Sequence, residues 1–139
     1  MSDTNCKICT MVLPSPYLVH ENDLWRIRHS NETDIEHYCI IESKRHFLDL
    51  SNARADELAE YAALLSKLMS AQRKLIPNCE RIYTFSLAEA VPHFHVHVIP
   101  RRDDFPADYI GRGIMSYPLS PALDFDRVGA LVSALRAHF

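Results

Sequence analysis

The order of the predicted elements indicates an α+β fold, in which an antiparallel sheet carries its helices on one side. Three observations support this class. Two short strand patterns, 24–29 and 36–42, flank a polar turn. A long amphipathic helix pattern follows over 53–76, and further strand patterns cover 80–87 and 93–99. Strands therefore come both before and after the long helix, as in an antiparallel α+β domain.

The first two strand segments are expected to form a hairpin. Residues 24–29 (LWRIRH) and 36–42 (EHYCIIE) are rich in β-branched and aromatic side chains, and the polar stretch 30–34 separates them. Short β-prone runs joined by a polar turn are typical of antiparallel pairs.

The segment 53–76 is predicted to be the main helix. Its apolar residues recur at steps of three and four, which places them on one helix face: Leu58, Tyr61, Ala62, Leu65, Leu68, Met69 and Ile76. Ser51 or Asn52 is the expected N-cap, and Pro77-Asn78 is expected to end the helix.

The remaining chain predicts two more strands, an irregular segment and a last helix. The strands are 80–87 (ERIYTFSL) and 93–99 (HFHVHVI), and prolines punctuate 101–123. Asp124 opens the last helix, which has one apolar face: Val128, Leu131, Val132 and Leu135.

Composition indicates one globular domain over 1–139. The chain has a hydrophobic fraction of 47%, a charged fraction of 24% and a net charge of −3. This balance disfavours nonspecific binding to nucleic acid or to a membrane surface. Because no apolar run approaches membrane length and the polar start lacks a signal-peptide core, we expect a cytoplasmic protein with reduced thiols.

Three histidines share one face of the strand pattern at 93–99. His93, His95 and His97 alternate with apolar residues, so their imidazoles point to the same side of a strand. Such a row suits metal binding, phosphate chemistry or both. Neutral imidazole is a good nucleophile near neutral pH, and protonated imidazole donates to phosphate oxygens.

Two of the four cysteines, Cys6 and Cys9, form a Cys-x-x-Cys motif. Their spacing suits two thiolates of a tetrahedral zinc site, which needs two further ligands. A redox pair and unligated thiols are the alternatives, although the βαβ context of redox motifs is missing. Cys39 and Cys79 are expected to be structural thiols.

The segment 91–101 (VPHFHVHVIPR) resembles the signature of the histidine triad family of nucleotide hydrolases and transferases. The Cys pair and 42–46 (ESKRH) resemble two further family segments in the family's order. The resemblance implies a five-stranded antiparallel sheet with two main helices, and a homodimer. It also implies that His95 attacks the α-phosphate to form a nucleotidyl-histidine intermediate, and that His97 contacts the phosphate.

The Cys pair and a short loop before the triad are similar to a zinc-containing branch of the family. That likeness implies a structural Zn²⁺ held by Cys6, Cys9, His46 and His93. A closed Cys₂His₂ site leaves no open position for catalysis. His93 would then lie beside the reaction without taking part in it.

The segment expected to bind the substrate departs from the family pattern. The loop 85–92 (FSLAEAVP) has no Gly, Gln or Asn, and Ser86 stands near the family's Asn position. His29 stands where an acidic ribose-binding residue is expected, and Arg101 is one of several arginines that supply positive charge. Ser86, His29 and Arg101 are therefore the candidate substrate-binding residues.

Three functions fit these observations. The first is an enzyme that cleaves a dinucleoside polyphosphate or a nucleoside phosphoramidate through His95. The second is a nucleotide-binding regulatory protein with little turnover. The third is a metalloenzyme in which His93, His95 and His97 ligate one metal. A small nucleotide is the expected partner in the first two.

Overall fold

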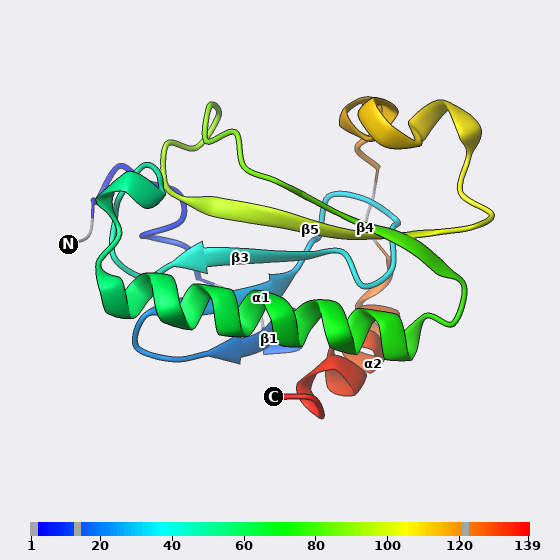
Figure 1. Cartoon of the computed structure of the whole chain (residues 1–139), viewed down its shortest axis with the longest axis horizontal. Helices are drawn as coiled ribbons and strands as arrows, with labels where there is room; N and C mark the ends of the chain where they lie inside the picture. The colour runs from blue at the N-terminus through cyan, green and yellow to red at the C-terminus, as the bar shows by residue number, and fades with distance from the viewer. Residues whose placement is uncertain (1–2, 13–14, 121–122) are drawn as a thin grey trace.

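The fold is a five-stranded antiparallel sheet with two main helices, as the family resemblance implies. The strand patterns alone predict four strands and miss the short edge strand Leu18–Glu21. The computed structural model describes residues 3–12, 15–120 and 123–139. The strand order in the sheet is β1-β2-β3-β5-β4, and α1 crosses one face of it (Figure 1). The main elements are β1 (Leu18–Glu21), β2 (Trp25–His29), β3 (Cys39–Ser43), α1 (Ala55–Leu75), β4 (Cys79–Phe85), β5 (His95–Arg102) and α2 (Phe125–Arg136). No helix in these ranges has the length and hydropathy that crossing a membrane requires.

The ends of the elements show where local pattern and structure differ. Helix α1 begins after Arg54, whose backbone N–H donates to the Glu57 carboxylate at 2.8 Å, so the predicted caps Ser51 and Asn52 are wrong. Strand β3 begins only at Cys39, because the chain at His37 has a φ of 63° and cannot continue as a strand. Asp124 caps α2 as predicted and accepts from the Arg127 N–H at 2.8 Å.

The core lies between the sheet and the two helices. Alternate residues of the central strands point to this side, including Trp25, Ile27, Ile41, Val96 and Val98. They pack against buried residues of the helices: Leu64, Leu68, Ala71, Val128, Val132 and Leu135. The intervening residues of the same strands must then face away from the helices.

The other face of the sheet carries the polar residues of the central strands. In the register of β2, β3 and β5, Arg26 lies opposite Glu42 and Glu42 opposite His95. Two residues further along the sheet, Arg28 of β2 lies opposite Ile40 of β3, and Ile40 lies opposite His97 of β5. A smaller apolar cluster continues this face: Ile35, Tyr38, Ile40, Ile99 and Ile114. The alternation therefore brings charged groups and two triad histidines together on the side without α1.

Two buried histidines fix the connection between β2 and β3. The Nδ1 of His29 donates to the Ser30 carbonyl oxygen at 2.8 Å, and its Nε2 accepts from the His37 backbone N–H at 2.9 Å. Burial lowers the pKa of both imidazoles, and that of His37 falls from 6.5 to about 4. Both rings are thus held neutral in the folded protein at neutral pH.

This neutrality predicts an acid-sensitive fold. Between pH 6.5 and about 4 the unfolded chain binds a proton at His37 that the folded chain excludes, so stability present above this range is lost as the pH falls. We expect His37→Asn, which keeps a residue tolerant of positive φ, to remove about 2 kcal/mol of the stability loss between about pH 7.5 and pH 5. Urea unfolding of both proteins at the two pH values measures this difference, and equal losses would contradict it.

Candidate functional site

His95 is held in the tautomer that a nucleophile needs. Its Nδ1 lies 2.6 Å from the backbone carbonyl oxygen of His93. A carbonyl oxygen can only accept, so Nδ1 carries the hydrogen and the lone pair of the neutral ring is on Nε2. The strand β5 holds the ring in this position, half exposed beside the pocket.

His97 is placed as a hydrogen-bond donor. Its Nδ1 lies 2.6 Å from the hydroxyl of Tyr38, and its ring stacks on Phe85 with centroids 4.7 Å apart. Burial, with the nearby His95 and Arg28, lowers the pKa of His97 to about 4. Burial also raises the pKa of Tyr38, so its hydroxyl stays protonated and donates to Nδ1. The neutral ring of His97 then carries its hydrogen on Nε2.

A pocket of about 480 Å³ opens in front of these two imidazoles. This volume lies within the usual range of small-molecule sites. The loop 87–91 forms one wall, and Lys7, Ile8 and Met11 of the N-terminal segment form another. Arg28 and Tyr38 also line the pocket. It is therefore built from parts of the chain that are far apart in sequence.

A smaller cavity adjoins the pocket. It measures about 180 Å³ and shares Glu32, Tyr38 and His97 with the larger pocket. Its other walls are mostly apolar, including Phe85, Ile99, Ile114, Met115 and Leu119. The two cavities together offer a polar end at the imidazoles and an apolar end beyond His97.

The four residues expected to hold a metal lie together. Sγ of Cys6 and Cys9 and Nδ1 of His46 and His93 all lie within 4.8 Å of one another. Three pairs are separated by 3.4, 3.4 and 3.5 Å between sulfur and nitrogen, and the two nitrogens by 3.1 Å. Zinc bonds of about 2.0–2.3 Å in a tetrahedron place ligand atoms roughly 3.3–3.8 Å apart, so the group fits one such ion.

The surroundings of His93 also suit a metal ligand. Its Nε2 lies 2.7 Å from the Ser43 carbonyl oxygen and therefore donates its hydrogen there. This leaves the Nδ1 lone pair directed at the cysteine sulfurs, and metal-binding histidines are commonly oriented in this way. His95 and His97 do not belong to this group. The arrangement thus does not favour one metal held by all three triad histidines.

The expected substrate-binding residues lie elsewhere. Ser86 is exposed just past the end of β4 and is not part of the pocket wall. Arg101 lies on the triad's face of β5 but six residues beyond His95, which is about 20 Å along a strand. His29 is fully buried on the helix side of the sheet, with Trp25 and Ile27. None of the three reaches the pocket.

The structure brings other groups to the pocket that the sequence analysis did not single out. Tyr38 contacts His97, and Arg28 lines the pocket with its side chain against Glu42. Strand alternation could have revealed Arg28, because it lies out of phase with the buried Trp25 and Ile27 of its own strand. Tyr38 has no such signal, since it precedes β3.

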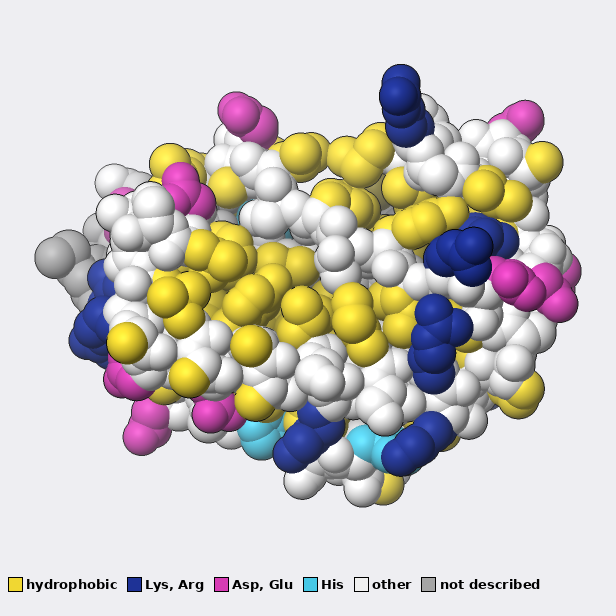
Figure 2. Space-filling view, in the orientation of Figure 1, with side chains coloured by type: hydrophobic (Ala, Val, Ile, Leu, Met, Phe, Trp, Pro, Cys, Tyr) yellow, Lys and Arg dark blue, Asp and Glu magenta, His cyan; other side chains and the backbone are white. Residues whose placement is uncertain are grey.

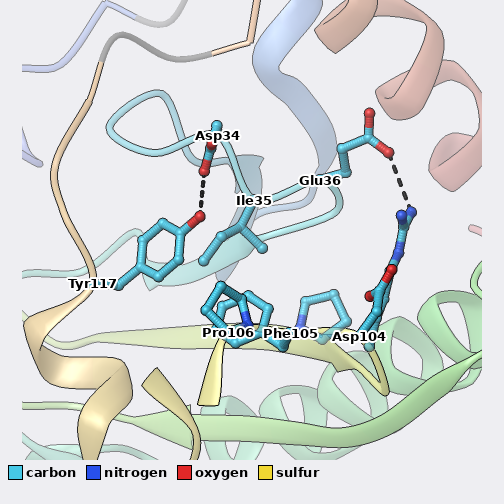
Figure 3. A pocket seen from close by; sticks show the side chains of 9 residues that line it. Asp34, Ile35, Glu36, Asp104, Phe105, Pro106 and Tyr117 are labelled. Carbon is cyan, nitrogen blue, oxygen red and sulfur yellow. Dashed lines mark hydrogen bonds and ion pairs between the residues drawn. The ribbon is translucent and has the colours of Figure 1, made fainter. Parts of the chain in front are cut away.

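A further pocket, of about 290 Å³, lies away from the triad (Figure 3). Its wall includes Asp34, which accepts from the Tyr117 hydroxyl at 2.5 Å, and Glu36, which pairs with Arg102 at 3.2 Å. Glu36 also accepts from Arg127 of α2 at 2.6 Å. These contacts tie the segment after β5 and helix α2 to the β2–β3 connection.

Fold and site together define a class: an antiparallel α+β protein with an imidazole row on β5 and a Cys₂His₂ group beside it. The family described as HIT domain matches residues 15–104, which is more than half of the chain. The chain therefore belongs to the HIT, or histidine triad, family. No curated protein matches the sequence.

Solved structures share the fold at low identity. A Zn-bound histidine triad family protein from Mycobacterium smegmatis has a TM-score of 0.70 and 21% identity, covering 96% of this chain and 94% of its own. A histidine triad protein from Sinorhizobium meliloti has a TM-score of 0.75 and 17% identity, with 94% and 98% covered. The diadenosine triphosphate hydrolase of Plasmodium falciparum has a TM-score of 0.67 and 12% identity, and the match covers 99% of this chain and 86% of that protein.

Proposed function

We propose that the protein is a nucleotide hydrolase or transferase that acts on the α-phosphate of a nucleoside phosphate derivative. The observation that carries this proposal is the hydrogen bond from His95 Nδ1 to the His93 carbonyl oxygen, which frees Nε2 beside a pocket of nucleotide size. The solved diadenosine triphosphate hydrolase of the same fold supports a phosphoanhydride substrate.

In the proposed reaction, Nε2 of His95 attacks the α-phosphorus and forms a P–N bond. The bond from phosphorus to the leaving group breaks, and the leaving group departs with the electron pair. The ring is then positively charged, and the His93 carbonyl oxygen that accepts from Nδ1–H stabilises this charge. His97 donates its N–H to a phosphoryl oxygen as charge develops there. The oxygen of water, or of another acceptor, then forms a bond to phosphorus and loses its proton to solvent, while the P–N bond breaks and its electron pair returns to Nε2 of His95.

We further propose that Cys6, Cys9, His46 and His93 hold a structural Zn²⁺. The donor atoms suit zinc, and their spacing fits a closed tetrahedral site. A Zn-bound relative of the same fold supports this choice of metal. The ion would join the N-terminal segment, a wall of the pocket, to the residue whose carbonyl orients His95.

The proposed intermediate gives a direct test. Wild-type protein is mixed with a panel of dinucleoside polyphosphates and nucleoside phosphoramidates, and the reaction is quenched at short times. We expect nucleotide release together with a protein adduct of one nucleoside monophosphate, located by mass spectrometry on the peptide that contains His95. Release without any adduct on this peptide would contradict the nucleotidyl-histidine route.

A nucleotide-binding protein with little turnover is the second candidate. The composition of the pocket loop favours it, because 87–91 (LAEAV) offers no side-chain donor to a phosphate and includes Glu89. Calorimetric binding of a nucleotide by wild-type protein, with no product and no adduct from any member of the panel, would establish this function instead.

We also propose that the protein forms a homodimer through α1 and the edge strand β4. Figure 2 shows hydrophobic side chains gathered on the face that carries α1. The exposed apolar residues of α1 include Leu58, Ala59, Ala62 and Ala63, and among the described residues β4 pairs only with β5. Sedimentation of the wild-type protein and of Ala62→Arg, which would place a charge in this interface, tests the proposal. A monomeric wild type would overturn it.

A further inference from the structure

Arg28 faces the pocket from the strand opposite the triad. On the sheet face that carries the imidazoles, it lies opposite Ile40 of β3, which in turn lies opposite His97 of β5. Its side chain is only 11% exposed, and it lines the pocket. The guanidinium therefore approaches the pocket from β2, two strands away from His95 and His97.

The contacts of Arg28 leave most of its donors unused. Its Nε lies 3.2 and 3.3 Å from the two carboxylate oxygens of Glu42. Glu42 is almost fully buried and also accepts from Nε of Arg26 at 2.6 Å. The two terminal nitrogens of Arg28 have no hydrogen-bond partner among residues 3–12, 15–120 and 123–139. Four of its five N–H donors thus remain for a ligand.

Donors arranged in this way suit a phosphate. The terminal nitrogens of a guanidinium bind two oxygens of a phosphate at once, and the contact is strengthened by the opposite charge. The terminal nitrogens of Arg28 are open to the pocket, so a ligand bound there can take the place of solvent at these donors. Glu42 contacts Arg28 through Nε alone and so fixes the direction in which the two terminal nitrogens of the guanidinium point.

The charges around the pocket favour this role of Arg28. Two acidic residues, Glu32 and Glu89, also line the pocket, but both are exposed. Solvent and salt screen exposed charges more strongly than the mostly buried Arg28. Lys7, on the N-terminal wall, adds a second positive charge. A substrate that is more negative than a monophosphate would gain from both.

We propose that Arg28 binds the phosphate next to the one that His95 attacks, so that the pocket selects substrates with two or more bridged phosphates. This inference rests on the proposed function and narrows its substrate class. The α-phosphate lies against the imidazoles of β5, and the neighbouring phosphate extends across Ile40 toward β2. A phosphoramidate with a neutral amine leaving group has no group for Arg28 to bind.

The test measures binding, so it does not depend on turnover. Calorimetry of the full chain with its metal compares a nucleoside diphosphate and the matching monophosphate as probes. We expect Arg28→Gln to weaken diphosphate binding by about 10–30-fold and monophosphate binding by less than about threefold. Arg28→Lys, which keeps the charge but not the paired donors of the guanidinium, is expected to recover part of the lost diphosphate affinity. It also serves as the second variant if the glutamine variant does not fold.

Arg26→Gln is the matched control. Arg26 pairs with the same carboxylate at 2.5 Å but is not part of the pocket wall. We expect it to leave the ratio of diphosphate to monophosphate affinity unchanged. Equal weakening of both probes by Arg28→Gln, or a changed ratio in Arg26→Gln, would overturn the inference, while turnover by the wild type would leave the proposed function standing. A wild type that neither binds nor cleaves a nucleotide would overturn both.

Discussion

Alanine in place of His95 is expected to lower kcat by a factor on the order of 10⁴ or more, because it removes the proposed nucleophile. The ring is half exposed, and within the described part of the chain it hydrogen-bonds only to the carbonyl oxygen of His93. Its loss should therefore leave the melting temperature within a few degrees of the wild type. Nucleotide binding should also persist, since Arg28 and His97 remain in the pocket.

Kinetics on the best substrate of the panel measure this effect, with melting and calorimetry as checks on folding and binding. His20→Ala is the matched control, because His20 lies on β1 and stacks on Phe139 at 5.1 Å, away from the pocket. It should keep the wild-type rate. If His95→Ala retained turnover within about tenfold of the wild type, the nucleophile would be a different group.

Loss of the proposed metal is expected to be the largest change in stability. Sγ of Cys9 lies within 3.5 Å of two other candidate ligand atoms, Nδ1 of His46 and of His93. Because binding energy at a structural site is folding energy, Cys9→Ser should cost on the order of 4 kcal/mol. For a chain of this length that lowers Tm by about 14 °C. Activity should fall as well, since the site holds the residue that orients His95.

Metal analysis of the purified protein and melting curves with and without a chelator test this prediction. Cys79→Ser is the control, because this thiol lies on β4 outside the metal group and donates a hydrogen bond to the Arg81 carbonyl oxygen at 3.5 Å. It should keep both the metal and the melting temperature. An unchanged melting curve of the wild type after chelation would contradict a structural ion at this site.

Much of the fold could be predicted because its signals are local. The alternation at 93–99 predicts three imidazoles on one side of a strand, and the structure has two of them, His95 and His97, on β5 (His95–Arg102), with His93 just before it. The spacing of apolar residues over 53–76 predicts a helix that the structure has at Ala55–Leu75. Where a local rule competed with tertiary contacts, prediction was less accurate. The N-terminus of α1 is capped by Arg54 and Glu57, and not by Ser51 or Asn52. Glu57 also forms an ion pair with Arg45 at 2.7 Å, a contact that the local pattern does not show.

His29 illustrates how a positional resemblance can mislead. Its place in the sequence suggested contact with the substrate, but it shares the phase of Trp25 and Ile27 and so points to the helix side. The residue before it, Arg28, has the opposite phase and lines the pocket. The alternation of side chains along the strand therefore shows which of these two neighbours faces the pocket, and position relative to a motif does not.

The sequence by itself determined the class of elements, the imidazole row and the pair of thiols, because each depends on spacings of a few residues. Only the tertiary structure decided which groups meet. Cys6 and His93 are 87 positions apart, Tyr38 and His97 are 59 apart, and both pairs are in contact. Such contacts follow from strand order and register, which depend on how the whole sheet packs against α1 and α2. No local pattern encodes them, because their free energy comes from burial shared by the entire core.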